Sequence, residues 1–185
     1  MNLGQMIMVL GALSLLGGLV LNTNSNLLET NQTMNNSEFG ITAVSLATSL
    51  VEEAMGKMYD ETIADSTSPA LTNPNQLSVT LGPVGGEQYR GGTSFDDFDD
   101  FNGLFLVYKS AVPADSVMTP GSSYEYKVKG LRAKYFVRAK VNYVNYTNLN
   151  DTSAVATWHK KITVTVTSPS SPDTLSFPAI MSYWN

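Results

Sequence analysis

Hydrophobic positions divide the chain into an apolar segment, an amphipathic segment and a series of short alternating runs. The first segment extends from Met1 to about Leu21, and between Met6 and Leu21 it carries no charged side chain and a single hydroxyl, that of Ser14. As a helix, residues 6–21 would span about 24 Å, and residues 1–5 would extend it to the roughly 30 Å of a hydrocarbon core. The pattern therefore predicts an apolar helix that requires an apolar environment around it.

A second helical stretch is predicted from residue 22 to about residue 59. Its apolar residues recur at spacings of three, four and seven, most regularly from Ile41 onward, which is the pattern of an amphipathic helix. The segment 22–36 is richer in Asn and Thr, which have lower helix propensity. The expected apolar stripe consists of Ala43, Leu46, Ala47, Leu50, Ala54 and Met58.

Beyond a Pro-, Asn- and Ser-rich loop at residues 60–76, the pattern changes to short runs of β-branched and aromatic residues. Strict alternation predicts half-buried antiparallel strands, as in KITVTVT, where Ile162, Val164 and Val166 share one face. The fold class predicted is α+β: a long N-terminal α-helix (domain 1–59) packed on a C-terminal, mainly antiparallel β-sheet domain (60–185). The runs predicted as strands are 77–81, 104–112, 124–130, 133–144, 158–168 and 175–184.

Composition narrows the function classes. The formal net charge is −5, the sequence contains no Cys, and His159 is its single histidine. No basic stripe is available to neutralise phosphates, so we expect no nucleic-acid partner. Thiol chemistry, disulfides and a Ser–His–Asp constellation find no support, and we expect a protein that is not an enzyme.

Several stretches resemble type IV pilins and the pseudopilins of type II secretion systems. They are MNLGQMIMVLGALSLLGGLVLN, AVSLATSLVEEAMGKMYDE, SFDDFDDFNG and LSFPAIMSYWN. The resemblance implies a structural subunit of an extracellular pilus-like filament on the cell surface, held in the inner membrane before the pilus assembly machinery adds it to other copies of itself. Two features depart from the family: Gln5 stands where pilins have Glu, and the chain begins with Met1 and shows no basic leader.

The length of the predicted helix also favours self-assembly, because about 90 Å over residues 1–59 would exceed the domain that the remaining residues could form. Stacked identical copies make a non-closing contact that grows into a helical filament. Two alternatives remain, a periplasmic pseudopilin and a single-pass membrane-anchored binding protein that does not polymerise. The filament core is expected within residues 1–28, at Met1, Gln5, Met6, Ile7, Val9, Leu10, Leu13, Leu15, Leu16, Gly17, Gly18, Leu19, Val20 and Leu21.

Three sets of polar residues could carry further chemistry. Closely spaced oxygen donors in DDFDDFNG suggest a calcium site or, alternatively, an acidic surface turn anchored by phenylalanines at a spacing of three. Asn145 and Asn150 fit the N-glycosylation acceptor pattern. Glu52 and Glu53 could pair with a basic residue or form a solvated helix face. The candidate calcium ligands are Asp96, Asp97, Asp99, Asp100 and Asn102.

Overall fold

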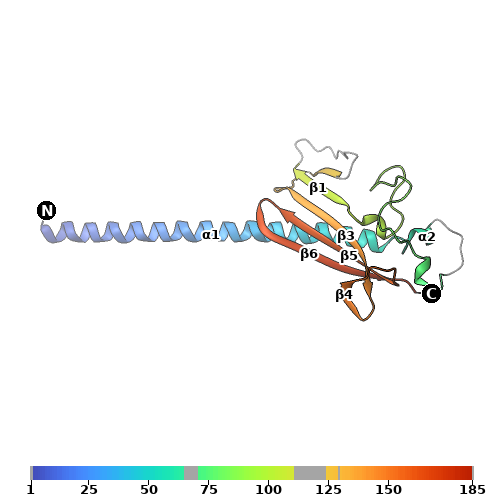
Figure 1. The fold of residues 1–185 in the computed structure, drawn as a ribbon. Helices are drawn as coiled ribbons and strands as arrows, with labels where there is room; N and C mark the ends of the chain where they lie inside the picture. The colour runs from blue at the N-terminus through green and yellow to red at the C-terminus, as the bar shows by residue number, and fades with distance from the viewer. Residues whose placement is uncertain (1, 65–70, 111–123, 129, 185) are drawn as a thin grey trace. The chain divides into compact units, whose positions relative to one another are not determined.

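The computed structural model describes residues 2–64, 71–110, 124–128 and 130–184. The chain divides into two compact units, Met1–Ile41 and Thr42–Asn185. Helix α1 (Leu3–Met55) accounts for almost all of the described first unit and enters the second, and every named strand belongs to the second unit (Figure 1). The predicted α+β class, with a long N-terminal helix and a C-terminal, mostly antiparallel sheet, is confirmed.

In the first unit the helix is continuous through the Asn- and Thr-rich segment that has low helix propensity. Hydroxyl side chains there donate back to the carbonyl four residues earlier, as Thr23 does to Leu19 at 2.9 Å and Thr33 does to Glu29 at 3.0 Å. Such bonds give each hydroxyl group a hydrogen-bond acceptor while the backbone stays helical. None of the described residues of this unit is buried.

The part of α1 that belongs to the second unit packs on the sheet with one narrow face. Its buried residues are Ala43, Ala47, Leu50 and Ala54, which follow the predicted stripe. Met58, also predicted for the stripe, is 54% exposed because α1 ends at Met55. Beyond the helix, the backbone at Met58 pairs with the segment around Asp97. The boundary between the two units at residues 41 and 42 precedes the end of the helix.

The sheet has the strand order β2-β1-β3-β5-β6, with β4 paired to β3. All pairs are antiparallel except β1 and β2, which are parallel. Alternation along β5 buries Ile162, Val164 and Val166, as the sequence pattern predicts. The strands are β1 (Phe105–Ser110), β2 (Tyr124–Val128), β3 (Tyr135–Asn145), β4 (Asn148–Thr152), β5 (His159–Ser168) and β6 (Ser171–Ser182).

One predicted strand is wrong, and one observed strand was not predicted. Residues 77–81 form no strand, because the Ser78 N–H and hydroxyl bind the carboxylate of Asp60 instead of a neighbouring strand. Strand β4 was not expected, because its residues are all exposed and it carries no hydrophobic alternation. Within the loop predicted at 60–76, the described residues include a short helix α2 (Glu61–Ala64) and the 3-10 turn η1 (Pro74–Gln76).

Candidate functional site

A cluster of buried charges lies between the sheet and the segments that follow α1. Lys160 comes from β5, Asp60 follows the helix, and Asp99 begins the 3-10 turn η2 (Asp99–Phe101). The Lys160 Nζ lies 2.6 Å from Asp60 Oδ2 and contacts Asp99 Oδ1, and the exposed fractions of the three side chains are 0%, 0% and 2%. Nζ also donates to the Tyr59 carbonyl at 2.9 Å, so all three N–H groups of the ammonium have acceptors.

Strand geometry explains why Lys160 is buried. Side chains alternate across β5, and Lys160 lies two residues before Ile162, on the face that packs into the core. The rings of Tyr59 and Tyr143 flank the ammonium, with Nζ at 4.7 Å and 5.4 Å from their centroids. Aromatic faces attract a cation, so these rings help to compensate its loss of water.

Asp60 is held as a carboxylate by many donors. Its oxygens accept from the backbone and hydroxyl of Thr62, the backbone and hydroxyl of Ser78, and the Tyr143 hydroxyl. Burial alone would raise the pKa of Asp60, but the charge and hydrogen bond of Lys160 and the donors on Thr62 bring it below the ordinary value. Asp60 therefore stays ionised at neutral pH.

A second buried carboxyl, that of Asp97, lies beside this cluster. Its Oδ1 accepts from the backbone N–H groups of Asp99 at 2.7 Å and of Asp100 at 3.0 Å, and its side chain hydrogen-bonds the carboxyl of Asp99. Burial, and then the charges of Asp99 and Asp100, raise the pKa of Asp97 to about 8. Since two carboxyl groups in contact share a hydrogen bond most readily when one is protonated, Asp97 holds a proton near neutral pH.

The five residues predicted as calcium ligands do not share one role in the turn. Asp100 Oδ2 accepts from the N–H groups of Asp96 and Asp97, and Asp97 Oδ1 caps the next turn. The Asn102 side chain donates to the Leu81 carbonyl and accepts from the Val141 N–H, both at 3.0 Å. These side chains hydrogen-bond within the turn and to the segments beside it, whereas Asp99 forms an ion pair with Lys160.

The predicted surface turn is wrong in one respect and correct in another. Its three phenylalanines, Phe95, Phe98 and Phe101, are buried as expected. Asp97, Asp99 and Asp100 are no more than 2% exposed and are therefore part of the core rather than of a solvated surface.

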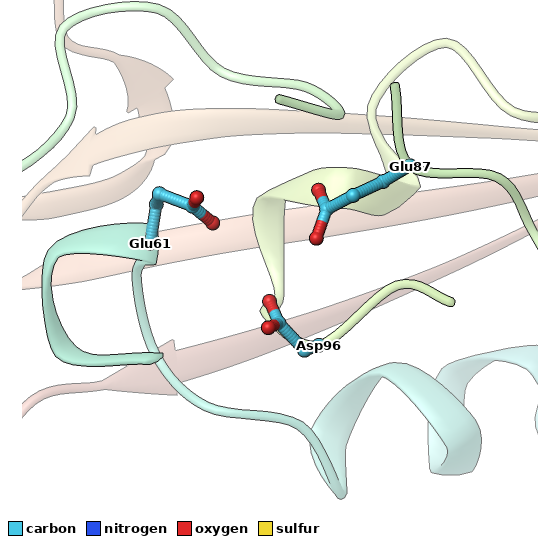
Figure 2. Close-up of side chains that lie close together, drawn as sticks. All are labelled: Glu61, Glu87 and Asp96. Atoms are coloured by element: carbon cyan, nitrogen blue, oxygen red, sulfur yellow. The ribbon is translucent and has the colours of Figure 1, made fainter. Parts of the chain in front are cut away.

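An acidic triad of Glu61, Glu87 and Asp96 offers a different arrangement of oxygen ligands. One carboxylate oxygen from each lies within 4.8 Å of the others (Figure 2). Burial raises the pKa of Glu87 to about 7. The hydrogen bond from the Val84 N–H opposes this rise in pKa, and the neighbouring Asp100 adds to it. Hard oxygen donors of this kind suit Ca²⁺, but only Asp96 belongs to the set expected from the sequence, and calcium binding stays a prediction.

Three separate segments supply this triad: the start of α2, the Gly-rich loop and the residues before η2. Nothing in the spacing along the chain indicates that they meet. The other sequence-predicted positions are dispersed. Asn145 and Asn150 are exposed in the β3–β4 hairpin, and the described residues expected in the filament core are all exposed, with Met1 outside the described residues.

Glu53, near the end of α1, is paired rather than solvated. Its Oε2 accepts from the Arg90 guanidinium at 2.9 Å and from the Tyr89 hydroxyl at 2.8 Å. Glu52, its neighbour, is exposed. Of the two alternatives left open by the sequence, pairing with a basic residue therefore holds for Glu53, and a solvated helix face holds for Glu52.

Comparison of the chain with protein-family models, with curated proteins and with solved structures finds no match. Among the described residues, one helix, α1, is long and apolar enough to cross a membrane.

Proposed function

We propose that the protein is a structural subunit of an extracellular type IV pilus-like helical filament, assembled through its apolar helices. The observation that carries this proposal is the apolar helical segment of residues 3–21, none of which is buried. Leu3, Met8 and Leu15 are between 75% and 79% exposed. No charged side chain occurs before Glu29, so charge does not oppose burial of this surface in another environment.

Burial of these side chains supplies the driving force. Each Leu, Ile, Val or Met that passes from water to an apolar environment contributes roughly 1.5–3 kcal/mol. Apolar residues surround the helix on all sides, so a single partner groove would leave part of this surface uncovered. Lipid and a bundle of identical helices both cover it completely, and the roughly 28 Å length of residues 3–21 suits a hydrocarbon core. The same apolar surface of the helix would therefore be covered first by lipid in the membrane and then by neighbouring helices in the filament.

Disulfide cross-linking in the native host tests the proposal directly. Because the sequence has no Cys, the double variant Leu10→Cys/Val20→Cys carries the only thiols of the chain. A filament in which neighbouring helices are staggered should give a ladder of covalent oligomers on oxidation. The single variant Leu10→Cys is the matched control, because one thiol per chain permits dimers at most. A monomer in both variants would contradict a filament and support the membrane-anchored alternative.

Electron microscopy of material sheared from cells separates the remaining readings. A major filament subunit should be abundant and should form fibres that disappear when Leu10 and Val20 are both changed to Glu, since buried unpaired charges are costly. A pseudopilin would be scarce and would yield no surface fibres. Gln5 carries no charge, so we expect Gln5→Ala to leave the cross-linked ladder unchanged. Loss of the ladder in this variant would instead show that the Gln5 side chain forms a hydrogen bond between neighbouring copies.

A further inference from the structure

Lys160 and Asp99 meet in a place from which solvent is excluded. Nζ contacts Asp99 Oδ1, and the side chains are 0% and 2% exposed. An amine in contact with a carboxyl oxygen lies about 3–3.5 Å from the carboxyl carbon, which is the range of a near-attack geometry. Both groups are fixed by the fold, Lys160 by β5 and Asp99 by η2. A nucleophile and an electrophile are therefore held together without bulk water.

We infer that Lys160 and Asp99 become joined by an intramolecular isopeptide bond. The Lys160 Nζ attacks the Asp99 Cγ, a new Nζ–Cγ bond forms, and one Cγ–O bond of the carboxyl group breaks. The two protons that Nζ loses leave with that oxygen as one water molecule. No oxidant, reductant or other co-reactant is consumed, since an ammonium and a carboxylate together contain every atom of an amide and a water.

Neighbouring groups can move the protons. Asp60 Oδ2 lies 2.6 Å from Nζ and can take a proton from it, which exposes the lone pair needed for attack. The side chain of Asp97 hydrogen-bonds the Asp99 carboxyl and can return a proton to the departing oxygen. Asp60 therefore acts on the reacting amine of Lys160, and Asp97 acts on the reacting carboxyl of Asp99.

The acceptor is Asp99 rather than Asp60, although both contact the amine. Asp60 is locked as an anion by donors from Thr62 and Ser78, and attack on its carbon would sacrifice those bonds. Asp99 has no comparable set of backbone and hydroxyl donors among the described contacts, and its main partners are Lys160 and Asp97. Loss of its charge thus disrupts less of the surrounding structure.

Burial favours the product. A buried ion pair has to offset the loss of water by both charges, whereas an amide carries none. The rings of Tyr59 and Tyr143 beside the amine keep the site dry and so oppose hydrolysis. The bond would connect β5 to η2 across 61 positions of sequence, which restricts the unfolded chain as a disulfide does in other proteins. Cys is absent from the sequence, so no disulfide provides such a cross-link here.

Mass spectrometry of the folded full-length protein in mild detergent tests the inference. The intact mass should be lower than the sequence mass by one water, and proteolysis should release a branched peptide that joins Asp99 to Lys160. Lys160→Arg should restore the sequence mass, because the guanidinium does not replace the amine as nucleophile. Lys161→Arg, the matched control on the next residue, should keep the deficit.

The wild-type result is decisive whether or not the variants fold. A folded wild-type chain with its full sequence mass, or a branched peptide that joins Lys160 to Asp60, would overturn the inference. Asp97→Asn should slow formation of the bond in freshly refolded protein, followed as the loss of one water over time; an unchanged rate would remove Asp97 from the reaction. These outcomes are independent of cross-linking through residues 10 and 20, so failure of this inference leaves the filament proposal standing.

Discussion

Replacing Lys160 by Met should destabilise the folded second unit more than almost any other single change on the sheet. The substitution keeps a long unbranched side chain, so it leaves little cavity. It removes the cation, or the amide partner, and leaves Asp60 and Asp99 as buried carboxylates. The test therefore changes the bonding and charge balance of the cluster with little change in its packing.

The expected cost is about 3–5 kcal/mol, the usual penalty for breaking a buried ion pair by removing one partner. Asp60 keeps its donors from Thr62 and Ser78, so most of this cost should come from Asp99. With a denaturant slope of about 2 kcal/mol per molar urea, the unfolding midpoint should fall by roughly 2 M. Trp158 fluorescence of the full-length chain in detergent reports the transition.

Two further variants test the role of the buried charges. In Lys160→Met/Asp99→Asn, the neutral amide removes one buried charge, and at least about 1 kcal/mol of the loss should return. Lys161→Met changes a half-buried lysine, whose Nζ donates an exposed hydrogen bond to the Leu149 carbonyl, and should cost less than about 0.5 kcal/mol. A loss below about 1 kcal/mol for Lys160→Met, or no recovery in the double variant, would show that the cluster does not stabilise the fold in this way.

Three other predictions concern neighbouring groups. The pKa of Asp97, about 8 against an ordinary 3.8, means that the folded chain keeps a proton that the unfolded chain releases. Stability should therefore fall as pH rises from about 4 to about 8, and urea titrations of Asp97→Asn should not show this decline. Chelation of calcium should lower the melting temperature of the wild type but not that of Glu87→Gln. If the wild type melts at the same temperature with and without the chelator, the calcium hypothesis is wrong. Tyr89→Phe removes the hydroxyl that binds Glu53 and should cost about 1–2 kcal/mol in thermal unfolding.

The elements that the sequence predicted well are those in which one pattern repeats for many residues. Alternation in β5, and in β3 from Tyr135 to Tyr143, follows from the burial of one face of each strand, and a shift of one residue would expose the apolar set. In α1 the first part is recognised by its long uninterrupted apolar run, and the part from Ile41 onward by its helical period. Strand β4 lacks such a pattern because it has no buried face, although it pairs antiparallel with β3.

The buried cluster was missed for a different reason. Asp60 and Lys160 are separated by 100 positions, so no local pattern connects them. The sequence attracted attention to the acidic turn as a whole, although only Asp99 of that turn reaches the lysine, and the acidic triad takes a single residue from it. Residue type and proximity along the chain indicate the acidic turn, but they do not indicate which of its residues meets Lys160 and which joins the acidic triad.

One signal was nevertheless present. The alternation that places Ile162, Val164 and Val166 toward the core also places Lys160 there, two residues before the first of them. A lysine in phase with a buried strand face is costly unless a counter-charge meets it, so its presence predicts buried carboxylates elsewhere in the chain. Those carboxylates should then come from segments that pack on the same face, as the residues after α1 and the turn η2 do. Polar residues in phase with apolar ones are therefore better indicators of a buried site than acidic runs, whose charges water can solvate.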